Sequence, residues 1–251
     1  MIKVSQKSQI QIIELNRPKV NAINEELIKS LLNQLNQVEQ DESIRGVILT
    51  GPNGIFSAGL DIVALYDKDR EYMRSFWVLF SSLLLRLYSY PKIIFSAISG
   101  HSPAGGTVLS IMTDYRIMSK GNFFIGLNEV AVGLSMPIGI GRVFQSLLGE
   151  RIAEKMTLIG ELVNPEKAQL IGLVDEVVES EELLDYSISI MEKWLKLPFD
   201  KQIQSKLSLR KNIINLMLET SNKENDEFLK AWFSDECKST MKGIIDKLSK
   251  K

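Results

Sequence analysis

The pattern of apolar and polar residues over the first 180 positions predicts a chain that alternates between strands and helices. Residues 9–15 alternate as in a half-buried strand, and apolar residues recur at helical spacing after Asn24, a predicted helix N-cap. Similar runs predict buried strands at 46–51, 92–99 and 114–118, a short strand within 172–179, and helices at 71–88 and 107–112. Strand, turn and helix thus repeat several times, which is typical of layered α/β folds.

The pattern changes near Ser180, after which almost every signal is helical. Pro198 and the polar stretch 219–226 are predicted to interrupt these helices. The last segment is amphipathic and carries Phe228, Trp232 and Phe233 among charged residues. Such an apolar stripe needs a surface to cover it. Packing on the chain's own core and contact with a second subunit both remain open from the sequence.

The composition limits the classes of partner. Of 251 residues, 30 are Lys or Arg and 31 are Asp or Glu, so the formal net charge of -1 predicts neither nucleic acid nor a membrane as partner. One histidine (His101) and one cysteine (Cys237) exclude a disulfide framework and a Cys/His zinc cluster within the chain, and we predict no metal site. Because the amino-terminal segment is polar and no apolar stretch reaches membrane-spanning length, we expect a cytoplasmic protein that acts on a small molecule.

The stretch 99–107 (SGHSPAGGT) lies between a predicted strand and a predicted helix and allows two interpretations. As a nucleophile elbow it would carry Ser102 as the attacking serine. That reaction needs a histidine from another loop, whereas the one histidine, His101, is the chain neighbour of Ser102. The next residue, Pro103, has no N–H group to offer an oxyanion. A serine nucleophile is therefore disfavoured, and His101 is predicted to be a structural turn residue.

The second interpretation uses the backbone of two turns. Gly105 and Gly106 open a predicted helix, where free N–H groups and the positive end of the helix dipole favour negative charge. Residues 56–61 (FSAGLD) form another turn of small residues, which lets the backbone approach a ligand closely. Two N–H groups from these turns on one oxygen atom would form an oxyanion hole. The simpler alternative is that the glycines only permit tight turns.

Several segments together resemble the crotonase, or enoyl-CoA hydratase/isomerase, superfamily. They are Asn16-Arg17-Pro18 with Asn21-Ala22, and residues 56–62, 99–106, 113–118, 125–129 and 166–178. The PAGG turn and the GLNE segment are most similar to Δ3,Δ2-enoyl-CoA isomerases of the mitochondrial type. The resemblance implies an α/β fold in which a crotonase-like spiral of ββα units (1–195) forms an acyl-CoA site. It further implies a carboxy-terminal helical region (196–251) that builds a homotrimer or hexamer.

The resemblance also implies a set of site residues by position. The N–H groups of Ala58 and Gly105 would hold the thioester carbonyl oxygen, and Glu129 would be the acid/base. The substrate-binding residues implied in this way are Ala22, Ala58, Gly59, Leu60, Asp61 and Gly105. Arg17 and Lys19 are left out, because exposed cations beside a proline are usually only solvated. Coenzyme A is part of the thioester substrate, so no separate cofactor is predicted.

The site positions favour one reaction of the superfamily. Its hydratases use two glutamates, and the corresponding positions here are Val108 and Glu129. A single carboxylate is suited to moving a proton from C2 of a 3-enoyl thioester to C4, through a dienolate whose charge lies on the thioester oxygen. The apolar flanks of Glu129 predict burial and a raised pKa.

The sequence therefore predicts an enoyl-CoA isomerase that acts in fatty acid β-oxidation, with Glu129, Ala58 and Gly105 as catalytic groups. A hydratase-like enzyme, an acyl-CoA thioesterase and a non-catalytic acyl-CoA-binding relative remain alternatives, because one scaffold serves many reactions.

Overall fold

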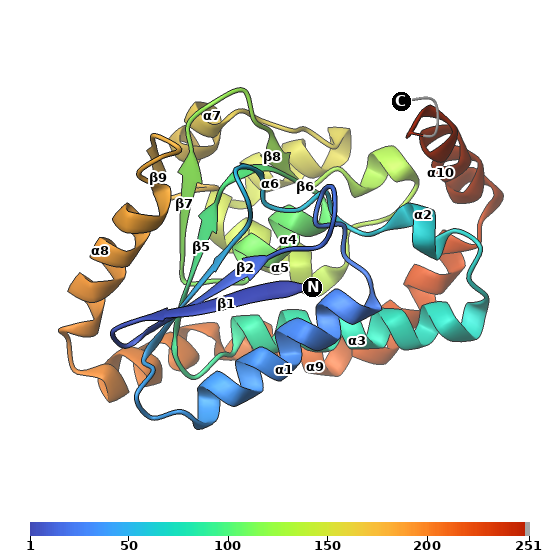
Figure 1. The fold of residues 1–251 in the computed structure, drawn as a ribbon. Coiled ribbons are helices and arrows are strands. Elements are labelled where there is room, and N and C mark those ends of the chain that lie inside the picture. Colours follow the sequence, from blue (N-terminus) through green and yellow to red (C-terminus); the bar gives the residue numbers. More distant parts are fainter. Residues whose placement is uncertain (249–251) are drawn as a thin grey trace.

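The computed structural model describes residues 1–248 and contains two sheets surrounded by helices (Figure 1). The large sheet has six strands in the order β1 (Ile2–Lys7), β2 (Ile10–Leu15), β3 (Gly46–Thr50), β5 (Ile93–Ile98), β7 (Tyr115–Ser119) and β9 (Glu176–Val178). Only the β1–β2 hairpin in this sheet is antiparallel. Three short parallel strands form the second sheet: β4 (Gly54–Ile55), β6 (Gly100–Pro103) and β8 (Ile125–Gly126).

The chain passes from the large sheet to the small sheet and then into a helix, three times. Strands β3 and β4 lead to α2 (Ile62–Leu65) and α3 (Arg70–Tyr88), strands β5 and β6 lead to α4 (Gly105–Ile111), and strands β7 and β8 lead to the 3-10 helix η1 (Glu129–Val132) and α5 (Ile138–Leu148). This repeat is the predicted spiral of ββα units. It gathers the three turns that follow β4, β6 and β8 on one side of the small sheet.

The two faces of the large sheet pack against different helices, because successive strand residues point in opposite directions. Ile12, Ile48 and Phe95 face α8 (Leu183–Leu195) through Met191 and its neighbours. The opposite face carries Ile13 and its equivalents in β3 and β5, and it packs on α1 (Glu25–Gln40), α3 and α4. The predicted N-cap of α1 is confirmed, since Asn24 Oδ1 accepts a hydrogen bond from Leu27 N at 3.0 Å.

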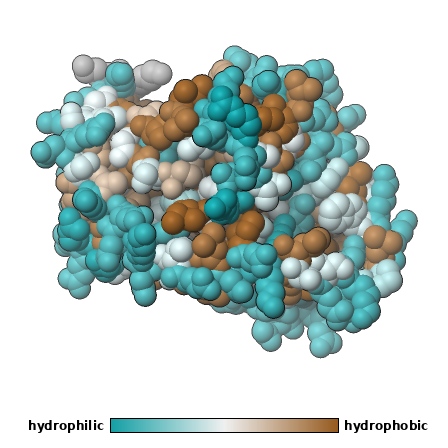
Figure 2. All heavy atoms as spheres, turned by 180° about the vertical axis from the view of Figure 1, so that it is seen from behind, coloured by the Kyte–Doolittle hydropathy of each residue, from teal (hydrophilic) through white to brown (hydrophobic). Residues whose placement is uncertain are grey.

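The remaining helices are α6 (Glu150–Ile159), α7 (Pro165–Leu170), α9 (Phe199–Trp232) and α10 (Asp235–Leu248). Helix α9 lies along α3 and α5, and α10 lies near α2 at the other end of the molecule from α8 (Figure 1). No helix within residues 1–248 is long and apolar enough to cross a membrane. Apolar side chains remain exposed in patches on the face opposite to that of Figure 1 (Figure 2).

Two sequence predictions differ from the structure, and one strand of the large sheet was not predicted. The polar stretch 219–226 does not interrupt a helix. All its polar side chains except that of Asn225 are exposed or hydrogen-bonded, as in Glu224, which accepts a hydrogen bond from Gly139 N at 3.1 Å. Gly100–Pro103 is strand β6 rather than part of a tight turn. Strand β1 was missed because all its residues except Ile2 are exposed.

The amphipathic end of α9 packs on the chain's own core, with Trp232 fully buried.

Candidate active site

A cavity of about 440 Å³ lies where the turns after β4, β6 and β8 meet α9 and α10. Most of the side chains that line it are apolar. The predicted residues in its wall are Ala22, Ala58, Leu60, Asp61, Gly105 and Glu129. Gly59 is not in the wall: its φ is 86°, and a Cβ atom there would lie 3.1 Å from Gly105 N. The glycine therefore lets the two turns touch, which is a different role from contact with substrate.

In the turn 56–61, all N–H groups but one donate a hydrogen bond within the protein. The acceptors are His101 O for Phe56 and Ser57 (3.0 and 3.3 Å), Val20 O for Ala58 (3.0 Å), Ser57 Oγ for Gly59 (3.2 Å) and Ile23 O for Asp61 (2.9 Å). Leu60 N–H alone has no acceptor among the described residues. The prediction that Ala58 N–H is a free donor is therefore wrong for this structure, because Val20 O occupies that group.

The direction of the Leu60 N–H group follows from peptide geometry. Gly59 O accepts a hydrogen bond from Ile23 N at 2.7 Å. Because the peptide unit is planar and trans, the N–H of Leu60 points away from Ile23 N. A Cβ atom on Gly105 would lie 3.3 Å from Leu60 N and 3.1 Å from Gly59 Cα. The Leu60 amide thus lies directly beside the start of α4.

The start of α4 supplies a second free donor. Ala104 O accepts the first helical hydrogen bond, from Val108 N at 2.9 Å, so the Gly105 N–H of the same peptide unit points out of the helix end. Within residues 1–248, Gly105 N–H has no acceptor. The preceding residue, Ala104, has a φ of 47°, which is uncommon for a residue with a Cβ atom and is typical of functional sites. Leu60 and Gly105 therefore offer two adjacent N–H groups to the cavity.

Glu129 is the first residue of η1 and lines the same cavity. Its Oε2 atom is buried and has no hydrogen-bond partner among the described residues. Burial raises the pKa of the Glu129 carboxyl to about 7, and a hydrogen bond from its own backbone offsets part of this effect. A carboxyl group with this pKa can both take and return a proton near neutral pH.

Among the described residues that line the cavity, one ionisable side chain besides Glu129 is present, that of Asp61, and its carboxylate already has partners. Asp61 forms an ion pair with Arg17 and caps α2 by accepting a hydrogen bond from Ala64 N at 3.0 Å. Arg17 also donates to Ala22 O at 3.0 Å, so it holds the loop beside the cavity. Val108, at the position of the hydratases' first glutamate, also lines the cavity and is 2% exposed. Glu129 is thus the one carboxylate of this wall without an ion pair.

The carboxy-terminal helices also contribute to the cavity, which the predicted division at residue 195 does not include. Phe228 and Trp232 from α9 and Ile244 and Leu248 from α10 line it. Phe228 stacks on Trp77 of α3, with ring centroids 3.7 Å apart. The amphipathic pattern of this segment predicted an apolar contact but not which surface it covers.

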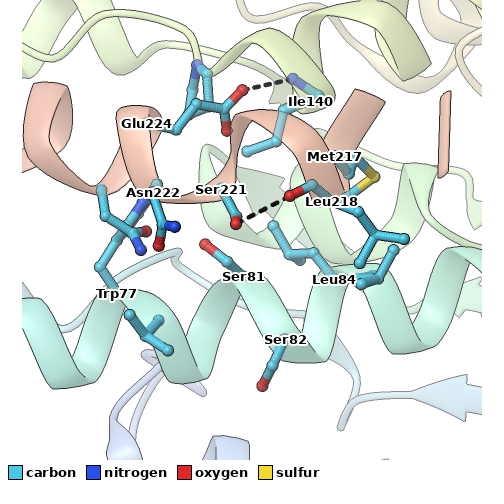
Figure 3. A pocket seen from close by; sticks show the side chains of 15 residues that line it. Trp77, Ser81, Ser82, Leu84, Ile140, Met217, Leu218, Ser221, Asn222 and Glu224 are labelled. Carbon is cyan, nitrogen blue, oxygen red and sulfur yellow. Dashed lines mark hydrogen bonds between the residues drawn. The ribbon is translucent and has the colours of Figure 1, made fainter. Parts of the chain in front are cut away.

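Two further features were missed by the sequence analysis. Asn128 lines the cavity beside Glu129, and its Oδ1 atom is buried without a partner among the described residues. A second cavity of about 250 Å³ lies between α3, α5 and α9 (Figure 3). It shares Trp77, Pro137 and Ile140 with the first cavity, so these side chains form the wall between the two.

Comparison with known proteins gives a consistent result. The sequence model of the family described as "Enoyl-CoA hydratase/isomerase" matches residues 5–251. The mouse protein "Enoyl-CoA delta isomerase 1, mitochondrial" is 32% identical over 100% of this chain and 88% of its own. The Escherichia coli (strain K12) 2,3-dehydroadipyl-CoA hydratase is 29% identical over 76% of this chain and 74% of its own. The crystal structure of human mitochondrial Δ3-Δ2-enoyl-CoA isomerase superposes with a TM-score of 0.96 at 28% identity, over 99% of this chain and 98% of that chain.

The two sheets, the ββα spiral and the helical carboxy-terminal region define a crotonase fold. The chain belongs to the enoyl-CoA hydratase/isomerase family of enzymes, as the resemblance of its motifs predicted.

Proposed function

We propose that this enzyme is a Δ3,Δ2-enoyl-CoA isomerase that uses Glu129 as its single proton carrier. The observation that carries the proposal is the cavity wall, where one unpaired carboxyl group lies in the same cavity as two free N–H groups. Isomerisation of a 3-enoyl thioester needs one group that moves a proton and one site that stabilises an enolate oxygen. The cavity offers one of each.

The chemistry is a proton transfer with no net change in composition. The Glu129 carboxylate takes the proton from C2 of the 3-enoyl thioester, and the electrons of that C–H bond move into a dienolate. The N–H groups of Leu60 and Gly105 donate to the thioester oxygen, which carries the negative charge. The Glu129 carboxyl then returns the proton at C4, and the double bond ends between C2 and C3. Leu60 replaces Ala58 in this account because Ala58 N–H is bonded to Val20 O.

Hydration is the main alternative, because hydratases are among the relatives of this chain. A hydratase of this type needs a second carboxylate to activate water, and Val108 occupies the corresponding wall position. A thioesterase and a non-catalytic binding protein need no proton return at C4. The product of the reaction distinguishes all four functions.

The physiological setting belongs to the same proposal. A role in fatty acid β-oxidation and assembly into a homotrimer or hexamer follow from the family resemblance. Exposed apolar side chains support assembly, among them Leu158 (70% exposed) and Leu170 (79% exposed) on α6 and α7. The names of the mouse and human relatives include "mitochondrial", so the cytoplasmic location predicted from the sequence has no support from them.

The test is incubation of the purified enzyme with trans-3-hexenoyl-CoA while three products are followed together. We expect conjugated 2-enoyl thioester, detected by its ultraviolet absorbance, as the first product. Release of free CoA thiol would indicate a thioesterase, and early 3-hydroxyacyl-CoA would indicate a hydratase. Tight binding of the thioester without any product would indicate a non-catalytic relative. Each of these three results would contradict the proposal.

A further inference from the structure

Two buried polar side chains connect the segment 17–23 to the turn 56–61 behind the cavity wall. Asn21 is 1% exposed and Ser57 is fully buried, and neither lines the cavity. Neither side chain therefore contacts a ligand in the cavity. Their hydrogen bonds nevertheless end on the backbone that carries the free Leu60 N–H group.

Asn21 fixes the loop before the first helix to the start of the turn. Its Oδ1 accepts from Arg17 N at 2.8 Å, and its Nδ2 donates to Phe56 O at 3.0 Å. The residue adopts a φ of 48°, a left-handed conformation that asparagine tolerates better than most residues. The side chain thus holds both its own strained backbone and the strand-to-turn junction.

Ser57 continues the connection from Asn21 to Gly59. Its hydroxyl donates to Asn21 O at 2.8 Å and accepts from Gly59 N at 3.2 Å. Gly59 O in turn accepts from Ile23 N at 2.7 Å. Because Gly59 C=O and Leu60 N–H belong to one planar peptide unit, these bonds together set the direction of the Leu60 N–H group.

We propose that Asn21 and Ser57 are positioning residues that hold the Leu60 N–H group in the direction of the thioester oxygen. The inference rests on the proposed function for its substrate but concerns the binding of the carbonyl group, which is measurable without turnover. Without the Ser57 hydroxyl, Asn21 O and Gly59 N lose a buried partner, and the Gly59–Leu60 peptide unit is held less firmly, through the bond between Ile23 N and Gly59 O. The carbonyl of the ligand then loses a well-directed donor, while the rest of the ligand keeps its contacts.

The test compares two ligands that differ in that carbonyl: octanoyl-CoA, a thioester, and S-octyl-CoA, a thioether. Their affinities are measured by calorimetry for the wild-type enzyme, Ser57→Ala and Ser187→Ala. Ser187 is a matched control, because it is also fully buried and its hydroxyl donates to the backbone, to Leu183 O at 2.7 Å, in a helix away from the cavity. We expect Ser57→Ala to weaken thioester binding about tenfold and thioether binding less than about twofold, and Ser187→Ala to change neither.

Steady-state kinetics provide a second readout of the same effect on the thioester carbonyl. Ser57→Ala is expected to raise KM for trans-3-hexenoyl-CoA about tenfold, in line with its loss of thioester affinity, and to lower kcat by about a further ten- to a hundredfold, because the donor matters most when charge develops on the oxygen. Asn21→Asp is the second variant: it keeps the acceptor for Arg17 N and loses the donor to Phe56 O. Asn21→Asp is expected, like Ser57→Ala, to lose more affinity for the thioester than for the thioether.

Three results would overturn the inference. One is an equal loss of affinity for thioester and thioether in Ser57→Ala or, if that variant does not fold, in Asn21→Asp. Another is unchanged thioester binding and kcat in a folded variant. The third is a wild-type enzyme that binds both ligands equally well. A wild-type enzyme that prefers the thioester but forms no 2-enoyl product would instead contradict the proposed isomerase reaction and leave this inference supported.

Discussion

At the scale of single residues, the burial of Glu129 determines how activity depends on pH. Because burial raises its pKa to about 7, the carboxyl is protonated in much of the enzyme below that pH and cannot take a proton from C2. We predict that kcat/KM rises with pH, with a slope of one on logarithmic axes, and becomes constant above about pH 7. Initial rates between about pH 5.5 and 8.5 test this, and a flat profile over that range would contradict it.

The same carboxyl group lowers the stability of the folded enzyme at alkaline pH. Its pKa is raised from 4.5 to about 7 in the folded state, so folded molecules bind more protons than unfolded ones between these values, and stability falls as pH rises through this window. We predict that Glu129→Gln increases the free energy of unfolding by about 1–3 kcal/mol at pH 8 and changes it little at pH 4, where both side chains are neutral. Urea unfolding at the two pH values measures this. Equal stability of the two proteins at pH 8 would show that the carboxyl is not destabilising.

The role of a single residue was predictable from the sequence only where its side chain, rather than its backbone, takes part in the proposed reaction. Glu129 was found from its motif and its apolar flanks, and the structure places it in the cavity. The backbone donors were harder to assign, because the same six-residue turn contains one free N–H group and five bonded ones. Which group stays free depends on Val20, Asn21 and Ile23, which lie more than thirty residues earlier in the chain. The sequence pattern of the turn alone does not contain that information.

At the scale of elements, contact between η1 and α10 holds the segment that carries Glu129. Gly133 ends η1 with a φ of 78°, and a Cβ atom there would lie 2.9 Å from Cys237 Cα in α10. We predict that Gly133→Ala forces these elements apart and lowers kcat about tenfold or more. Gly149→Ala is the matched control, because Gly149 has a φ of 76° but nothing within 4 Å of such a Cβ atom.

The comparison separates crowding from backbone strain. Both variants place alanine at a positive φ, with a ψ of 21° at Gly133 and 160° at Gly149, so both are expected to lose about 1–3 kcal/mol of stability. Only Gly133→Ala also moves the segment of Glu129. A similar kcat in the two variants would show that the contact with α10 does not position the carboxylate.

At the same scale, strands were predictable from the sequence where both of their faces are buried. The runs that form β2, β3, β5 and β7 are nearly all buried, so their apolar residues were recognisable. The strands of the small sheet were missed, because β4 and β8 have two residues each and β6 has four, which is too short for a periodic pattern. These short strands place the turns of the site.

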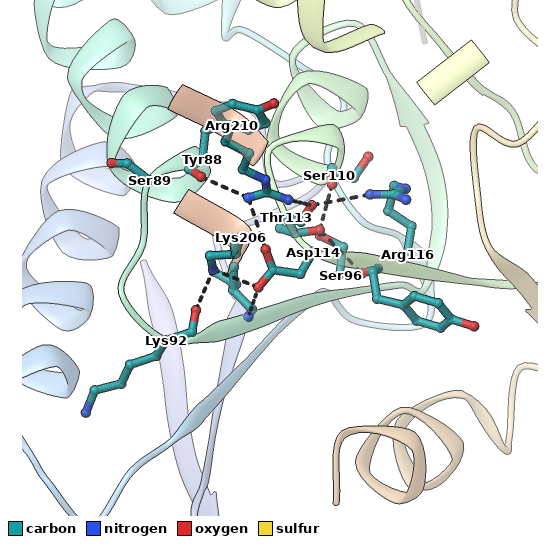
Figure 4. Close-up of polar contacts among 12 residues, drawn as sticks. Tyr88, Ser89, Lys92, Ser96, Ser110, Thr113, Asp114, Arg116, Lys206 and Arg210 are labelled. Carbon is teal, nitrogen blue, oxygen red and sulfur yellow. Dashed lines mark hydrogen bonds and ion pairs between the residues drawn. The ribbon is translucent and has the colours of Figure 1, made fainter. Parts of the chain in front are cut away.

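At the scale of the whole molecule, a buried charge cluster fastens the long helix α9 to the sheet (Figure 4). Asp114, the residue just before β7, is 5% exposed in its side chain and pairs with Lys206 at 2.8 Å and Arg210 at 3.0 Å. Lys206 also donates to Lys92 O at 2.7 Å. Since α9 supplies Phe228 and Trp232 to the cavity, this cluster links the sheet to a helix that forms part of the site.

Loss of one partner from this cluster leaves a buried charge less well compensated. We predict that Lys206→Met lowers the free energy of unfolding by about 3 kcal/mol, because Asp114 keeps only one of its two cations. Lys201→Met is the control on the same helix, since Lys201 is exposed and its ammonium group donates to the side chain of Gln204 rather than to a buried carboxylate. Urea unfolding of both variants tests this, and equal stability of the two would contradict a structural role for the cluster.

The overall fold was predictable because the repeat of strand, turn and helix extends over 180 residues. The course of α9 was not, because its polar stretch 219–226 resembles a loop in composition. Its helical state depends on tertiary contacts such as that of Glu224 with Gly139 N. Local propensity is a weak guide where such contacts decide the conformation.

The most direct test of the account is the rate at which Glu129→Gln converts trans-3-hexenoyl-CoA to the conjugated 2-enoyl thioester. Glutamine keeps the size of the side chain but does not carry a proton between carbon atoms. The account predicts a fall in kcat of about a thousandfold or more, with thioester affinity close to that of the wild-type enzyme. A variant that retains more than about a tenth of the wild-type kcat would show that another group moves the proton, and the central claim would be wrong.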